Sequence, residues 1–220
     1  MHSQDSGWES PPGNYFYLQG SRSQFAVKGA LGPFIPLWLG GDEAWEDPVV
    51  DEPLLQQDLF GQSGKPGGWM YGSQRQWDAL QDPTSRASLM AKDVAALLAI
   101  QQTHADVLTK DTCGASAIAE LPCTPPNPSL APYVRYLSGQ KAVLVLGNSD
   151  HASTTFVVNV PLAAMGFAGK GPFTASYLYG GDGTKGNFTL SEGALAAFSA
   201  VVPGDFQAGG GATALLLLVD

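Results

Sequence analysis

Two acidic residues, Asp42 and Glu43, stand where parallel sheets commonly build a binding or catalytic site. They follow the apolar run at residues 34–39, which is bounded by glycines and is typical of a strand buried on both faces. The carboxyl ends of such strands carry the site residues, so these two carboxylates are candidates for contact with a ligand. The alternative is that they cap the next turn or neutralise Arg22 or Lys28.

The tryptophans are the second group suited to a ligand, because an indole offers a flat apolar surface that matches the C–H face of a sugar ring. All five lie before residue 80. Trp38 lies within the apolar run and Trp77 within a short predicted helix, so we expect both to pack in the interior. The candidates for carbohydrate contact are Trp8, Trp45 and Trp69.

The sequence has no residue pattern typical of a metal, cofactor or phosphate site. His2 and His104 are isolated histidines without ligand spacing, so we expect neither a metal site nor a cofactor. Residues 61–65 lack the spacing of a phosphate-binding loop. The formal net charge of −9 disfavours nucleic acid as a partner. The apolar stretch at residues 215–219 is far shorter than the roughly 20 residues that a membrane-spanning helix needs, so we expect no membrane partner.

Two features concern covalent chemistry. Cys113 and Cys123 could close a short loop as a disulfide, which would stabilise the fold by roughly 2–3 kcal/mol, but two reduced thiols fit the sequence equally well. Asn187, Phe188 and Thr189 form an N-glycosylation triplet of a kind that often arises by chance. Neither feature decides the compartment.

The elements that must position these residues begin with an expected helix at residues 21–31, the strand at 34–39 and a long polar and aromatic loop at 42–72. A second helix is expected from residues 82–85 to about His104. The stripe expected to face the interior consists of Met90, Val94, Leu97, Leu98 and Gln101. The side chains expected to face water are those of Arg86, Lys92, Asp93 and Gln102.

Beyond residue 108 the sequence changes in character. Prolines in residues 109–132 discourage helix and central strand, which predicts a linker there. Residues 133–220 hold short β-branched or aromatic runs separated by turn residues, which predicts an antiparallel β-sandwich. The expected strands lie at residues 133–137, 142–146, 154–160, 173–179, 200–202 and 212–219. A helical turn capped by Ser191 is expected before the last two. Because a helix, a strand, a long loop and a second helix precede this sandwich, the predicted fold class is α+β.

Four segments, in this order, carry a resemblance to a known family. They are Ser-Gln-Asp at residues 3–5, Phe-Ile-Pro-Leu-Trp-Leu-Gly-Gly-Asp-Glu at 34–43, the helix end at 97–104, and the two runs 133–136 and 141–148. They resemble the Asn-His-Asp motif, the last barrel strand, the closing barrel helix and the opening sandwich hairpin of the α-amylase superfamily of glycoside hydrolases. Gln4 stands in place of the family's His and Ala105 in place of its Pro.

The resemblance implies that residues 1–108 are the C-terminal segment of a (β/α)8 catalytic barrel and that residues 133–220 are its C-terminal domain. Asp5 would be the carboxylate that stabilises the transition state. The residues that would contact substrate are Gln4, Trp8, Asp42, Glu43, Trp45 and Trp69. The family takes its nucleophile and general acid from strands that precede the Asn-His-Asp motif, so we expect both to be missing and this chain alone to be inactive.

We therefore interpret the chain as a C-terminal fragment or subunit of a glycoside hydrolase that acts on glucan or a related oligosaccharide. The alternative is a non-catalytic carbohydrate-binding or structural β-domain protein. Strands that precede Asp5 and carry an Asp and a Glu would favour the interpretation as an enzyme. A change in tryptophan fluorescence when oligosaccharide is added would favour carbohydrate binding over a purely structural role.

Overall fold

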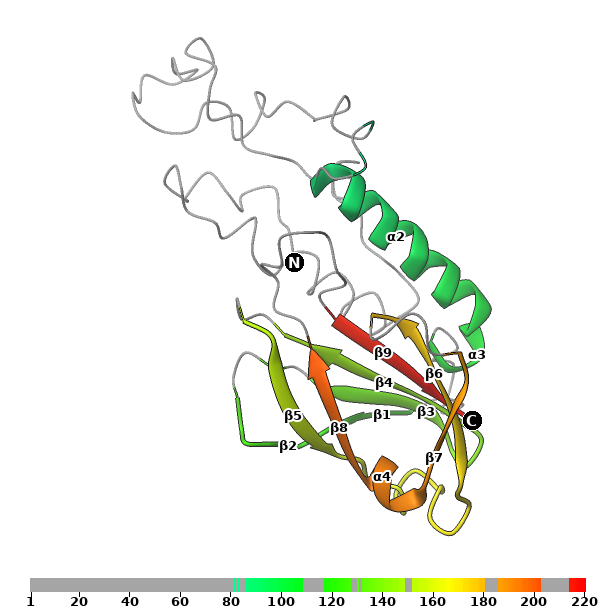
Figure 1. Ribbon diagram of the computed structural model, residues 1–220. Helices are drawn as coiled ribbons and strands as arrows, with labels where there is room; N and C mark the ends of the chain where they lie inside the picture. The colour runs from blue at the N-terminus through cyan, green and yellow to red at the C-terminus, as the bar shows by residue number, and fades with distance from the viewer. Residues whose placement is uncertain are drawn as a thin grey trace, which may run out of the picture.

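The computed structural model of the protein describes residues 81, 83, 86–108, 117–127, 130, 132–148, 152–180, 186–202 and 214–220. The helix expected at 21–31 and the strand expected at 34–39 lie outside these residues. In the described part, the helices are α2 (Arg86–Thr103), α3 (Ala105–Leu108) and α4 (Glu192–Ala196). The remaining described elements are β-strands in two antiparallel sheets (Figure 1).

The larger sheet has six strands in the order β1-β3-β4-β9-β6-β7. Their bounds are β1 (Ala117–Glu120), β3 (Tyr133–Leu137), β4 (Lys141–Gly147), β9 (Ala214–Val219), β6 (Phe173–Tyr179) and β7 (Phe188–Leu190). The smaller sheet has three strands in the order β2-β5-β8. These are β2 (Cys123–Thr124), β5 (Thr154–Asn159) and β8 (Ala197–Val202). Strand β9 is the last of the described strands in the sequence but lies between β4 and β6.

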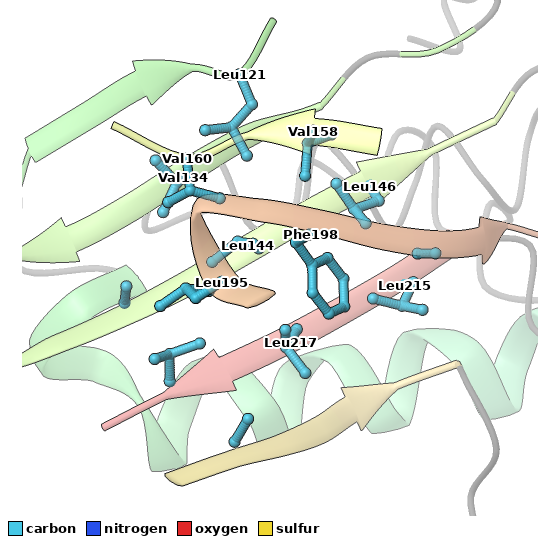
Figure 2. Close-up of a cluster of buried hydrophobic side chains, with 14 of the residues drawn as sticks. Leu121, Val134, Leu144, Leu146, Val158, Val160, Leu195, Phe198, Leu215 and Leu217 are labelled. Atoms are coloured by element: carbon cyan, nitrogen blue, oxygen red, sulfur yellow. The ribbon is translucent and has the colours of Figure 1, made fainter. Parts of the chain in front are cut away.

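The two sheets enclose one hydrophobic core. In β8 the residues alternate, with Phe198, Ala200 and Val202 buried and the residues between them exposed. This period of two is what a sheet with one face in solvent requires. Figure 2 shows Phe198 of the smaller sheet in the same cluster as Leu144 and Leu217 of the larger one.

Strands β4 and β9 are covered on both faces, which explains their continuous apolar sequence. In β9, Leu215, Leu217 and Val219 belong to the core between the sheets. Residues 214, 216 and 218 belong instead to a second cluster on the opposite face, together with Val94 of α2 and residues of α3. The described part therefore has three layers: two helices, the six-stranded sheet and the three-stranded sheet (Figure 1).

The predicted buried face of helix α2 is confirmed in part. Val94, Leu97 and Gln101 are buried as expected, but Asp93 is only 7% exposed and Leu98 is 39% exposed. Residues 94–100 are all apolar, so apolar residues occupy more than one side of this helix. Sequence spacing therefore predicted most of the buried face but not its edges, where Asp93 and Leu98 lie.

Strands β1 and β2 lie inside residues 109–132, the range predicted to be a linker. Strand β1 pairs with β3, and β2 pairs with β5. The prolines of this range flank the strands: the Pro122 carbonyl accepts from Asn159 N at 2.9 Å, and the Pro132 carbonyl accepts from Leu121 N at 3.0 Å. Proline is tolerated at strand ends because no ladder donor is needed there.

The predicted α+β class, with antiparallel strands dominating, is confirmed for the described residues. The predicted helical turn is also confirmed: α4 follows Ser191, whose side chain accepts a hydrogen bond from Ala194 N at 3.2 Å. This bond satisfies one of the free N–H groups at the start of the helix. Two sheets over one core are the arrangement expected of a sandwich.

Candidate functional site

Five described polar residues are almost completely buried: Ser88, Asp93, Gln101, Arg135 and Asn148. Asn148 follows β4, and its side-chain amide donates to the carbonyls of Ala152 and Val202 at 2.9 and 3.2 Å. Arg135 lies on the face of the six-stranded sheet that the helices cover. Charged groups are rarely buried, because removal from water must be offset by new polar contacts. We therefore take this helix–sheet layer as the candidate site.

Arg135 is the most deeply buried charged residue of this layer, with 2% of its surface exposed. It lies on β3, on the same face as Tyr133, and its Nε donates to the carbonyl oxygen of Val107 at 3.1 Å. Val107 belongs to α3, whose last carbonyls have no partner within the helix. A guanidinium at a helix C-terminus satisfies such a carbonyl and complements the negative end of the helix.

Tyr133 shares this environment. Burial raises the pKa of its phenol far above the usual range, and the nearby charge of Arg135 opposes that shift only in part. The hydroxyl is therefore protonated over the whole physiological pH range. It is suited to hydrogen bonding within the interface and not to proton transfer.

A second group of ionisable residues lies at the corner where α2 ends and α3 begins. Lys141 Nζ of β4 and Asp106 Oδ2 of α3 form an ion pair at 2.8 Å. Burial alone would raise the pKa of Asp106, but the hydrogen bond and charge of Lys141, with backbone N–H groups, hold it below its usual range. The pair connects α3 to the β3–β4 hairpin.

His104 completes this corner. Burial lowers the pKa of its imidazole, and the charge of Lys141 lowers it further, while Asp106 and Asp220 act in the opposite direction. Its Nδ1 is buried and has no hydrogen-bond partner among the described residues. A neutral imidazole is a possible base, but general base catalysis also needs a substrate group within hydrogen-bond reach.

The contacts of this layer hold the helices on the sheet. Arg135 and the Lys141–Asp106 pair join α3 to β3 and β4, and the hydrophobic cluster that includes Tyr133 holds both α2 and α3. Within the described ranges, no group of three or more His, Cys, Asp or Glu residues could hold a metal ion. No helix among those described is long and apolar enough to span a membrane.

The residues predicted from the sequence to form the site lie outside the described residues. These are Gln4, Asp5, Trp8, Asp42, Glu43, Trp45 and Trp69, and their roles stay predictions. Cys123 lies in β2 as a half-buried free thiol, and its predicted disulfide partner Cys113 is also outside the described residues.

Sequence reasoning missed Arg135 and Asp93 as buried residues. For Arg135 a signal existed, because it interrupts the strand run Tyr-Val-Arg-Tyr-Leu and alternation places it on the same face as Tyr133. For Asp93 no signal existed, since a charged residue beside an apolar stripe is ordinarily expected to face water.

No family model matches the chain, and a search of curated proteins finds no match.

Proposed function

We propose that this chain is the C-terminal part of a glycoside hydrolase acting on glucan or a related oligosaccharide, and that its described residues form a non-catalytic domain. Catalysis would require a nucleophile and a general acid from strands that precede Asp5. The described domain would hold the last helix of the catalytic part in place. No cofactor is part of this proposal.

The observation that carries the proposal is the packing of α2 and α3 on the six-stranded sheet. The end of α2 belongs to the segment that resembles the closing helix of the barrel, and Val94 and Leu97 belong to the same hydrophobic cluster as residues of β4 and β9. A buried charged residue, Arg135, adds a directional bond from β3 to α3. A domain fixed to a barrel helix in this way would stabilise the barrel's flank.

The composition of the described domain favours a structural role for it over carbohydrate binding. Every tryptophan of the chain precedes residue 80, so the sheets contain none. The exposed residues of β8 are Ala197, Ser199 and Val201, which offer no flat aromatic surface for a sugar. Carbohydrate contact is therefore assigned to the segment before residue 80.

The first experiment measures the mass of the native polypeptide with an antibody raised against residues 133–220. A complete barrel needs roughly 250 residues by itself, so the proposal predicts a band well above the 23.0 kDa of this chain. A native band at 23.0 kDa would contradict the proposal that the chain is a fragment, and it would favour the alternative, a binding or structural β-domain protein.

The second experiment titrates the chain with maltooligosaccharides and follows tryptophan emission, which reports only on residues before 80. Saturable changes are expected for the wild type. They are expected to disappear in a Trp8→Phe, Trp45→Phe, Trp69→Phe variant. The matched control carries Trp38→Phe and Trp77→Phe, which are predicted packing residues, and should still respond. If none of the glucans changes the tryptophan emission, the result would count against carbohydrate contact by the segment before residue 80.

A further inference from the structure

Asn187 begins the triplet Asn187-Phe188-Thr189, which the proposed function does not use. N-glycosylation requires an asparagine followed, after any residue except proline, by serine or threonine, and a bulky sugar on that asparagine must lie at the surface of the folded protein. In the structure Asn187 and Thr189 are exposed, whereas Phe188 between them is half-buried. The folded domain therefore leaves the asparagine that would carry the sugar, and the threonine that completes the triplet, facing solvent.

This alternation has a structural cause. Phe188 and Thr189 lie in β7, where successive side chains point to opposite faces of the sheet. Phe188 packs against the core, and its ring centroid lies 5.3 Å from that of Tyr177. Because Phe188 is directed inward, its neighbours on both sides are directed outward.

The position of β7 leaves space for a large group. It is the terminal strand of the six-stranded sheet and has only three residues (Figure 1). The neighbouring Gly186 is equally open, since a Cβ atom built there would meet no atom within 4 Å. A sugar on Asn187 would displace no packed side chain of the described residues.

We propose that Asn187 is an N-glycosylation site. In the transfer, Nδ2 of Asn187 attacks C1 of the first sugar of a lipid-pyrophosphate-linked oligosaccharide. The N–C1 bond forms, the bond between C1 and the pyrophosphate oxygen breaks, the lipid pyrophosphate leaves, and Nδ2 gives up one proton. No oxidation or reduction takes place. The chain supplies the acceptor, and a transferase of the secretory pathway supplies catalysis.

The modification has a physical consequence for the sheet. An edge strand presents backbone N–H and C=O groups that can pair with a strand of another molecule. A bulky, hydrated sugar beside β7 blocks that approach. It also means that this domain is exposed to the lumen of the secretory pathway, where such transfer occurs.

The sequence contains its own negative control. Residues 127–129 read Asn-Pro-Ser, which has the spacing of the triplet but carries the excluded proline in the middle. Asn127 is also half-buried. Asn127 is therefore expected to stay unmodified in the same protein sample in which Asn187 carries sugar.

The test uses the protein from its native source, captured with the antibody against residues 133–220. Trypsin cleaves after Lys185, and residues 186–220 contain no further lysine or arginine, so Asn187 lies on the tryptic peptide that begins at residue 186. Treatment with an amidase that removes N-linked sugar is expected to lower the mass of the protein and to convert Asn187 to Asp in that peptide. A native peptide with unmodified Asn187 overturns the proposal.

A second arm tests the structural argument. The chain is expressed behind a secretory leader in a eukaryotic host, and its mass is measured with and without the amidase. The wild type and Thr189→Ser are expected to lose mass, whereas Asn187→Gln and Thr189→Ala are not. A wild-type chain that behaves like Asn187→Gln would show that the triplet is inaccessible, and it would overturn the proposal without affecting the proposed hydrolase function.

Discussion

The orientation of α2 can be tested with two adjacent leucines. Leu97 is 2% exposed and lies in the cluster between α2 and the six-stranded sheet, whereas Leu98 is 39% exposed. Leu97→Ala removes three buried carbon atoms, which corresponds to about 2.4 kcal/mol of transfer free energy at ~0.8 kcal/mol per methylene. The cavity left behind adds to this, so the expected loss of unfolding free energy is about 2–5 kcal/mol. Leu98→Ala is expected to lose about 1 kcal/mol or less.

The assay is urea denaturation of the full chain, followed by far-ultraviolet circular dichroism. Tryptophan emission is unsuitable as the probe, because every tryptophan precedes residue 80. Hydrogen exchange of the β4 and β9 amides gives an independent measurement, since both strands lie beneath the helices. If Leu98→Ala proves as destabilising as Leu97→Ala, or more so, the assignment of the buried face of α2 is wrong.

Three further predictions concern the same domain. The folded-state pKa of His104 lies below its ordinary value of 6.5, so its contribution to stability is complete above that pH and is lost as the pH falls toward the folded-state pKa. The difference between the urea midpoints of the wild type and His104→Gln should therefore change as the pH is lowered from neutral to mildly acidic. A difference that stays constant with pH would show that protonation of His104 does not affect stability. Lys141→Ala breaks the partly exposed pair with Asp106 and should lower the unfolding free energy by about 0.2–1 kcal/mol at low salt, with a smaller difference in high salt. Because the pKa of Asp106 is lowered, its contribution should disappear only at acidic pH, below its ordinary value of 3.8. Ser191→Ala removes the cap of α4 and should lower stability by about 0.5–2 kcal/mol, whereas Ser191→Asp should retain most of it; equal losses for both would argue against capping.

The strands that sequence analysis located best are those with strong local patterns. Residues 133–137 form β3 as predicted, and the apolar run that predicted the last strand forms β9. Ser191 also caps α4 as predicted. In each case the deciding interaction is local or the apolar run is long enough to require burial.

The strands that it missed are short and lie at or near sheet edges. β1, β2 and β7 have four, two and three residues, and β1 and β7 end the larger sheet. An edge strand needs little apolar pattern, because its outer side is not packed, and its pairing partner is set by the rest of the fold. Prolines near β1 and β2 further obscured them, although these prolines proved compatible with strand ends.

The candidate site could be predicted even less well than the edge strands, because contacts between residues distant in the sequence form it. Arg135 donates to a carbonyl 28 residues away, a pairing that no spacing rule connects. The carboxylates and tryptophans singled out from the sequence lie outside the described residues, so their predicted roles await the experiments above.

The place of β9 in the six-stranded sheet has a consequence for synthesis on the ribosome. Residues 214–219 are translated after every other described strand, yet they form the junction between β4 and β6. Until they leave the exit tunnel, the nascent sheet exists as two halves, each with an open edge that can bind a chaperone or another nascent chain. A chain that ends before residue 214 would lack the strand that joins the two halves, so its β4 and β6 edges would stay open to aggregation.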